Sequence, residues 1–249
     1  MSKIVSVHSF RGGTGKSNTS ANLAMSLAQL GRRVCVVDTD IQSPGIHVMF
    51  QVNPGELRYS LNDFLWGKCE ISQATVDVHT SDSGGKIFLI PSSMKTGDIA
   101  RVLKYGYDIQ LLREGFLNII SELEIDVLLI DTHPGLNEET LMSIALSDML
   151  LIILRPDAQD YQGTAVTVEV ARQIEVPEMY LVLNKVPRVF DRNQTIAKAK
   201  EAFRCPVLAL LPHADEMMTL ASDGIFIREF PDHAVTQEIE NIARKIIAQ

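Results

Sequence analysis

The segment S-F-R-G-G-T-G-K-S at residues 9–17 constrains the fold of this chain more than any other stretch. An aliphatic run at residues 4–7 precedes it, and a helical pattern extends from about residue 17 to residue 30. Glycines let the backbone N–H groups of such a loop turn inward, and the N-terminus of the following helix adds a partial positive charge. The order of strand, glycine-rich loop and helix therefore predicts a phosphate-binding loop at one end of a β-sheet.

Each polar position of this loop has a predicted task. Lys16 is predicted to reach the β- and γ-phosphates of a nucleotide, and Ser17 offers a hydroxyl to a Mg²⁺ ion that bridges phosphate oxygens. The alternative is a glycine turn followed by a chance lysine. It does not explain why a strand precedes the loop and a helix follows it. The loop residues predicted to contact the nucleotide are Arg11, Gly12, Gly13, Thr14, Gly15, Lys16, Ser17 and Asn18.

The rest of the chain predicts an α/β fold. Short aliphatic runs alternate with helical patterns, which is typical of a mainly parallel central sheet flanked by helices on both faces. No long linker interrupts the chain, so we expect a single domain over residues 1–249. The runs lie at residues 4–7, 34–37, 87–90, 127–130, 150–154, 180–183 and 207–211, and the expected core stripes are Leu23, Leu27 and Leu30 in one helix and Ile109, Leu112, Phe116, Ile119 and Leu123 in another.

Composition excludes several classes of protein. The chain has 249 residues, a net charge of −8 and 46% hydrophobic residues, as expected of a globular protein with a large core. Apolar runs such as residues 149–154 are far shorter than the roughly 18 residues that cross a bilayer. Cys35, Cys69 and Cys205 are odd in number and form no C-x-x-C pair, so we expect neither a disulfide framework nor an iron–sulfur site, and a cytoplasmic location.

Two further motifs follow predicted strands, in the order that a known family uses. Residues 38–45 read D-T-D-I-Q-S-P-G and residues 131–135 read D-T-H-P-G. Together with the loop at residues 9–17, they resemble the deviant Walker A motif (K-G-G-x-G-K-[ST]), switch I and switch II of the ParA/MinD ATPases. The resemblance implies a P-loop fold, slow and partner-stimulated hydrolysis of ATP with Mg²⁺, and a homodimer that encloses ATP.

The resemblance also implies tasks for the carboxylates. Asp131 would bind Mg²⁺ together with Ser17, and Asp38 would support the metal and the switch loop. Asp40 would orient the attacking water, while the N–H group of Gly135 would contact the γ-phosphate. His133 lies within switch II and is a candidate general base, although local packing or hydrogen bonding explains it equally well.

One departure from the family pattern concerns a catalytic cation. Arg11 stands where the family has its signature lysine, which crosses the dimer interface to touch the phosphates of the partner. An arginine can still take this part, because its planar guanidinium binds phosphate oxygens bidentately and stays charged. The competing candidate is Arg155, which follows another predicted strand. We expect Arg11 to be the trans cation.

The choice of base is predicted from the stretch around Asn184. Residues 181–185 read L-V-L-N-K and resemble the base-binding strand end of the family, and Pro212 closes the last predicted strand as in relatives. Asn184 offers a donor and an acceptor to the edge of adenine. Residues 184–187 read N-K-V-P and lack the aspartate of an N-K-x-D guanine motif, so adenine is favoured over guanine. A simple turn at the strand end is the alternative.

A basic stretch suggests a macromolecular partner. Residues 185–204 contain six cations and two carboxylates in a chain whose net charge is −8. Such a patch could bind nonspecific nucleoid DNA through phosphate contacts, as ParA-type relatives do, whereas a solvated helix surface is the alternative. The candidate DNA-binding residues are Lys185, Arg188, Arg192, Lys198, Lys200 and Arg204.

The cargo is the least constrained expectation. Loss of the signature lysine resembles the McdA branch, which spaces carboxysomes through an adaptor protein of the McdB kind, while plasmid or chromosome partition stays open. A MinD-like protein would instead use a C-terminal membrane helix. Here Ile239, Ile242 and Ile246 form a stripe without an aromatic anchor, and the opposite face carries both acids and bases, so residues 236–249 are predicted to pack on the core and membrane binding is not expected.

Overall fold

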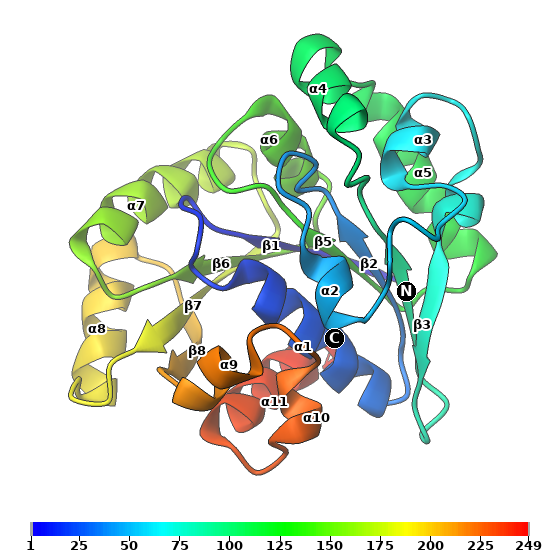
Figure 1. Cartoon of the computed structure of the whole chain (residues 1–249). Helices are drawn as coiled ribbons and strands as arrows, with labels where there is room; N and C mark the ends of the chain where they lie inside the picture. Colours follow the sequence, from blue (N-terminus) through cyan, green and yellow to red (C-terminus); the bar gives the residue numbers. More distant parts are fainter. Residues whose placement is uncertain (1, 249) are drawn as a thin grey trace.

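The computed structural model describes residues 2–248, which form an eight-stranded sheet covered by helices on both faces (Figure 1). The strand order is β3-β4-β2-β5-β1-β6-β7-β8, and every neighbouring pair is parallel except β3 and β4. This arrangement confirms the predicted fold class. The strands are β1 (Lys3–His8), β2 (Arg33–Asp38), β3 (Val76–Thr80), β4 (Lys86–Ile90), β5 (Val127–Asp131), β6 (Met149–Leu154), β7 (Glu178–Val186) and β8 (Val207–Pro212).

The helices divide between the two faces of the sheet. Alternate residues of a central strand point to opposite faces, so Val34 and Val36 of β2 pack in one core while Cys35 and Val37 pack in another. Helices α1 (Lys16–Gln29), α2 (Ile46–Met49), α10 (Phe226–Glu229) and α11 (Ala234–Ile247) contribute to the first core, and α9 (Asp215–Leu220) lies beside it. The second face carries α3 (Leu61–Leu65), η1 (Ile71–Ala74), α4 (Thr96–Tyr105), α5 (Ile109–Glu122), α6 (Glu138–Ala145), α7 (Ala158–Gln173) and α8 (Arg192–Phe203).

Strand β3 is the strand that the sequence did not predict. It pairs antiparallel with β4 at the edge of the sheet, with an irregular register between Asp77 and His79. Its side chains are exposed or only partly buried, so it lacks the continuous apolar run by which the other strands were recognised. The seven strands predicted from aliphatic runs are all present.

The predicted core stripes hold at most positions, although Ile109 of α5 is only partly buried and lies outside the core clusters. Leu23 and Leu27 of α1 are fully buried, but Leu30 is 39% exposed because the helix ends at Gln29 and the chain turns away. In α11, Ile239, Ile242 and Ile246 are at most 2% exposed and pack against the core that includes α1, as predicted. Gln249 lies outside the described residues.

Parallel strand register brings the motif residues to one edge of the sheet. Strand β5 lies between β1 and β2, with Val7 and Asp38 both aligned with Asp131. The loops that follow β1, β2 and β5 therefore meet beyond the carboxyl ends of these strands, where open α/β sheets bind their ligands. In the part of the chain that the structure describes, every helix is too short or too polar to span a membrane, and all three cysteines are free.

Candidate functional site

The loop between β1 and α1 forms a cradle of backbone groups. Gly13 and Gly15 have φ angles of +76° and +97°, in the left-handed region that favours glycine. A side chain at Gly15 would also overlap the amide of Asn184. Helix α1 begins at Lys16 with no acidic residue in its first turn, so the positive end of its dipole is not neutralised from within. This loop is built to receive an anion.

Within the cradle, one buried hydroxyl lacks a hydrogen-bond partner. The Oγ1 atom of Thr14 is inaccessible to solvent and bonds to no other atom of residues 2–248. Buried polar groups are nearly always hydrogen-bonded, so an orphaned hydroxyl inside a phosphate loop is evidence for a missing ligand. The cradle thus fits a phosphate group on an observation independent of its motif.

The carboxylate of Asp131 lies directly behind this loop. It is 1% exposed, and the hydroxyl of Ser20 in α1 donates to its Oδ1 atom at 2.9 Å. Burial raises the pKa of Asp131, although the charge of Lys16 and hydrogen bonds from Ser17 and Ser20 oppose that shift. The structure therefore brings Asp131 together with Lys16 and Ser17.

A second carboxylate, Asp38, is fully buried beside Asp131. Burial and the nearby charges of Asp131 and Asp40 hold its pKa well above the ordinary value, against hydrogen bonds from the N–H groups of Asp40 and Gly45 at 3.1 and 3.3 Å. Two adjacent buried carboxylates favour either a shared proton or a bound cation.

A Mg²⁺ ion fits this donor set in one particular way. Among residues 2–248, no three or more His, Cys, Asp or Glu side chains are grouped closely enough to hold a metal on their own. Mg²⁺ is commonly held by one or two carboxylates together with substrate phosphates and water. Asp131, Asp38 and Ser17 fit an ion that is shared with phosphate oxygens in the neighbouring loop, and not a closed protein cage.

The two switch loops meet through a pair of side chains. His133, after β5, places its Nδ1 atom 2.6 Å from Oδ1 of Asp40, after β2. Sequence reasoning named both residues but did not connect them, because they are 93 positions apart. The only signal for this contact is that each residue follows a strand, and that the two strands are neighbours in the sheet.

Gly135 lies where its φ angle of +88° requires a glycine, next to the phosphate loop. Its N–H group, predicted to contact the γ-phosphate, donates instead to the carbonyl of Ser9 at 3.1 Å. The predicted contact therefore needs this bond to break when a nucleotide binds. Pro134 lies close to Gly12, so switch II already touches the loop.

Both candidates for the trans cation converge on one carboxylate of α7. Arg155 donates to Asp160 through its backbone N–H at 2.9 Å, its Nε at 3.0 Å and its Nη2 at 3.2 Å. Arg11 reaches the same carboxylate with Nη1 alone, at 3.5 Å, and lies 4.0 Å from Asp157. Asp157 also caps α7 by accepting from the N–H group of Asp160, which fixes that first turn.

A cavity of about 190 Å³ adjoins the loop on its other side. Asn184, Pro212 and Asn18 line it, which brings together three residues that were predicted to bind the nucleotide. The side chain of Asn184 is partly committed, since its Nδ2 donates to the carbonyl of Thr14 at 2.8 Å and its Oδ1 accepts from the N–H group of Lys185. One amide hydrogen and one lone pair stay available for a base. The apolar lining of the cavity includes Ala214, Met217, Met218 and Val235.

Lys185 is exposed, and its side chain also reaches the phosphate loop. Its Nζ atom donates to the carbonyl of Gly13 at 2.8 Å, and its φ angle of +55° is unusual for a lysine. The sequence assigned Lys185 to DNA binding because of the neighbouring cations. Its position directly after Asn184 was the signal for a contact with the loop.

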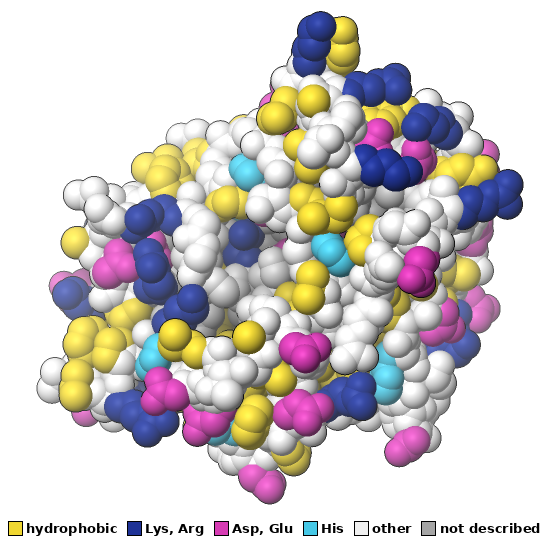
Figure 2. Space-filling view, in the orientation of Figure 1, with side chains coloured by type: hydrophobic (Ala, Val, Ile, Leu, Met, Phe, Trp, Pro, Cys, Tyr) yellow, Lys and Arg dark blue, Asp and Glu magenta, His cyan; other side chains and the backbone are white. Residues whose placement is uncertain are grey.

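The predicted DNA-binding residues do not form an uninterrupted patch. Arg192 is paired with Glu238 of α11 at 2.7 Å, and Lys198 lies over the ring of Tyr161. Figure 2 shows Lys and Arg side chains over α7 and α8, mixed with acidic ones, and a further group over α3 and α4. With Lys185 directed to the loop, Arg188, Lys198, Lys200 and Arg204 are the cations left for an external partner.

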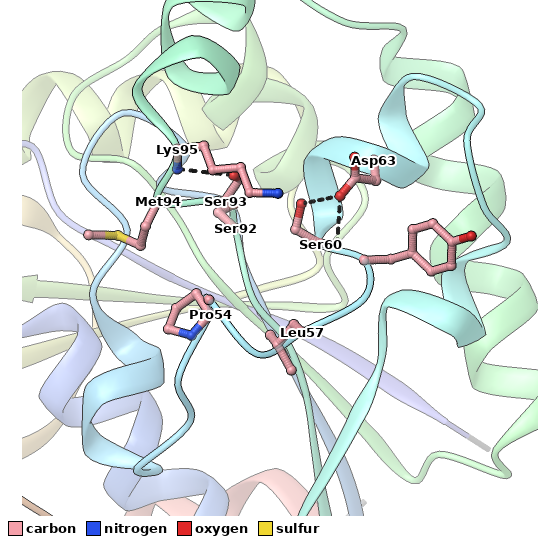
Figure 3. Close-up of a pocket in the computed structure, with 10 residues that line it drawn as sticks. Pro54, Leu57, Ser60, Asp63, Ser92, Ser93, Met94 and Lys95 are labelled. Atoms are coloured by element: carbon pink, nitrogen blue, oxygen red, sulfur yellow. Dashed lines mark hydrogen bonds between the residues drawn. The ribbon is translucent and has the colours of Figure 1, made fainter.

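A second cavity, of about 140 Å³, lies near switch I (Figure 3). Its hydroxyl groups are already used: Ser60 donates to Asp63, Ser93 to Asp98, and Ser92 to the carbonyl of Asp38. The serine hydroxyls of this pocket are therefore committed to the fold, and the Ser92 bond at 2.7 Å supports the strand end that carries Asp38.

Comparison with known proteins places these motifs in a family context. The AAA domain family matches residues 2–179. The septum site-determining protein MinD of Bacillus subtilis is 27% identical over 257 residues, covering 100% of this chain and 90% of that protein. Pyrococcus horikoshii MinD complexed with Mg-ADP superposes with a TM-score of 0.82 at 20% identity, over 99% of this chain and 96% of that one. A complex of Cyanothece McdA with ATP gives 0.80 at 18% identity, over 99% and 96%.

Proposed function

We propose that this chain hydrolyses ATP with Mg²⁺ and dimerises in its ATP-bound form. The reason is that it belongs to the AAA domain family and, within it, to the ParA/MinD-type P-loop ATPases. The observation that carries this proposal is the meeting of three elements at one sheet edge: the phosphate cradle, the buried pair Asp38 and Asp131, and Asp40. Each supplies a part that phosphoryl transfer requires, and that reaction depends mainly on positioning and charge neutralisation.

The residues divide the work as follows. Backbone N–H groups of the loop and the ammonium of Lys16 hold the phosphates, while Ser17 and Asp131 hold the metal with support from Asp38. Mg²⁺, when bound, neutralises charge on the phosphate oxygens. Asp40 orients the attacking water. Adenine occupies the cavity bounded by Asn184 and Pro212, and the turnover is slow until a partner stimulates it.

Arg11 acts as the trans cation of a deviant Walker A loop. Two facts favour it over Arg155: it makes one long contact to Asp160, and its side chain is 39% exposed and able to leave. Arg155 is held by three bonds to the same carboxylate. Arg11→Ala is expected to abolish ATP-dependent dimerisation while ATP binding persists. An undiminished dimer in that variant would exclude Arg11.

The biological output of the switch is the positioning of an intracellular cargo over nucleoid DNA through an adaptor protein. Structural similarity to McdA makes a carboxysome one candidate cargo, with an adaptor like McdB, and a plasmid or chromosome the others. Arg188, Lys198, Lys200 and Arg204, doubled in a dimer, supply the phosphate contacts. DNA binding is expected with ATP and not with ADP or without nucleotide, measured by fluorescence anisotropy on a duplex. Equal weak binding in all three conditions would end the DNA proposal.

A MinD-like membrane protein that places a division or surface assembly is the second candidate. The similarity to MinD over the whole chain favours it, whereas the apolar stripe of α11 is buried against the core and is not free for lipid. Sedimentation with anionic vesicles and ATP separates the two candidates, since only the membrane protein would enter the pellet.

Hydrolysis itself is tested by phosphate release in the presence of Mg²⁺. Lys16→Ala and Asp131→Ala are expected to lose activity, the first through phosphate binding and the second through the metal. Omission of Mg²⁺ should have the same effect as Asp131→Ala. Unchanged release in either variant would refute the site.

A further inference from the structure

We propose that His133 is a positioning residue, which fixes the carboxylate of Asp40 so that this carboxylate can orient the attacking water. The inference rests on the proposed ATPase function and adds a residue to it. It follows from how the two oxygens of Asp40 are used, and not from the ionisation of either side chain.

One oxygen of Asp40 is anchored twice. Its Oδ1 atom accepts from Nδ1 of His133 at 2.6 Å and from the N–H group of Ser43 at 3.1 Å. No hydrogen bond to Oδ2 occurs among residues 2–248. A carboxylate held by one oxygen has a fixed plane and keeps the lone pairs of its other oxygen for a water molecule.

The anchor adds a side-chain contact between two loops that are already joined where Thr39 donates to the carbonyl of Asp131. Asp40 lies in the loop after β2 and His133 in the loop after β5, and the strands are paired through Asp38 and Asp131. Gly135, two residues after His133, donates to Ser9 at the start of the phosphate loop. The hydrogen bond from His133 therefore ties the carboxylate of Asp40 to the segment 133–135, which lies against the phosphate loop.

The opposite assignment makes His133 the general base and Asp40 its support. In that arrangement the catalytic atom would be a ring nitrogen of His133, which an amide cannot replace. In our assignment only a donor near the Nδ1 position is required, and the amide of an asparagine can supply one. His133→Ala and His133→Asn therefore distinguish the two assignments.

The kinetic test compares four variants. These are His133→Ala, His133→Asn, Asp40→Asn and the double variant His133→Ala/Asp40→Asn. His133→Ala should lower kcat about 10- to 100-fold, since small misplacements in an active site have effects of this size, while the Kd for a fluorescent ATP analogue stays within about twofold. His133→Asn should restore most of kcat, and the double variant should be no slower than Asp40→Asn. His79→Ala, at the edge strand β3, is the control and should leave kcat unchanged.

A measurement without nucleotide tests the contact itself. In ¹⁵N-histidine-labelled protein, the Nδ1 proton of His133 should give a downfield resonance that disappears in Asp40→Ala, which removes the acceptor, but persists in His79→Ala. If the resonance of His133 is the same with and without the Asp40 carboxylate, the contact is absent and the inference is wrong.

The kinetic outcomes are equally decisive. A His133→Asn variant as slow as His133→Ala would overturn the positioning assignment, as would a His133→Ala variant with wild-type or higher kcat. If the wild-type protein neither binds nor hydrolyses ATP, the proposed function fails, and the histidine resonance still reports whether the Asp40 contact exists.

Discussion

Arg155 binds the buried carboxylate of Asp160 with both ends of its guanidinium, through Nε at 3.0 Å and Nη2 at 3.2 Å. Asp160 is only 2% exposed, so its charge depends on this contact. Bidentate arginine–carboxylate pairs are among the strongest and most geometrically specific contacts in proteins. Arg155 is therefore committed to the start of α7, whereas Arg11 makes only longer contacts there, at 3.5 Å to Asp160 and 4.0 Å to Asp157.

Removal of Arg155 should therefore weaken the fold. Arg155→Ala leaves a buried carboxylate without its main partner, which typically costs about 1–3 kcal/mol or more for a charged group. We expect the free energy of unfolding to fall by that amount in urea denaturation, whereas Arg11→Ala should change it by less than about 0.5 kcal/mol. Equal losses in both variants would contradict the division of labour between the two arginines.

The same pair gives stability a defined dependence on pH. Burial alone would raise the pKa of Asp160, but hydrogen bonds and charge from Arg155 outweigh it, so the pKa lies below the ordinary value. A depressed carboxylate pKa contributes stability above the unfolded-state pKa, and this contribution is lost as pH falls through the folded-state pKa. The stability difference between wild type and Asp160→Asn should be largest at pH 7 and shrink below about pH 4. A gap that stays constant from pH 7 to pH 3 would refute this account.

Helix α7 is also packed against the phosphate loop through a glycine. A Cβ at Gly163 would overlap the ring of Phe10, which precedes Arg11. Gly163→Ala should displace Phe10 and lower the affinity for ATP by roughly tenfold, because the loop must keep its shape to hold phosphates. Phe10→Ala removes the obstacle, so it should make Gly163→Ala nearly silent. Additive losses in the double variant would show that the two residues do not interact.

Two glycines outside the site provide a matched pair of substitutions that tests packing in the core. A Cβ at Gly115 of α5 would overlap Phe64 and Ile71, whereas one at Gly97 of α4 meets no atom within 4 Å. Gly115→Ala should therefore destabilise the protein by about 1–3 kcal/mol through overpacking. Gly97→Ala should instead stabilise it by up to about 1 kcal/mol, since alanine is the better helix former. Thermal unfolding of both variants checks the opposite signs.

The sequence could predict those parts of the fold that have a local signal. Central parallel strands are buried on both faces and therefore appear as aliphatic runs, and the glycines at 13 and 15 mark a loop with positive φ angles. Strand β3 gave no such run because it lies at the edge, where its side chains are exposed or only partly buried. Strand β3 forms only by pairing with β4, and no local pattern in the sequence encodes that pairing.

In the site, the individual motif residues were predictable from the sequence, but the contacts between motifs were not. Motifs placed Lys16 at the start of a helix and Asp38 and Asp131 at strand ends, and strand register then brought the two carboxylates together. The contacts between motifs were not predictable: Asp160 accepts from both Arg11 and Arg155, and the amide of Asn184 bonds to Thr14. These pairs are separated by up to 170 residues, and they depend on how α7 and β7 pack.

The most direct test of the central claim is the molar mass of the protein in solution, measured by light scattering with Mg²⁺ and ATP. The Asp40→Asn variant should retain ATP and double its mass from the 27.6 kDa of one chain, and it should return to that mass with ADP. Lys16→Ala, which cannot hold the phosphates, should stay at the lower value throughout. A mass of one chain for Asp40→Asn in every nucleotide state would contradict the nucleotide-driven dimer.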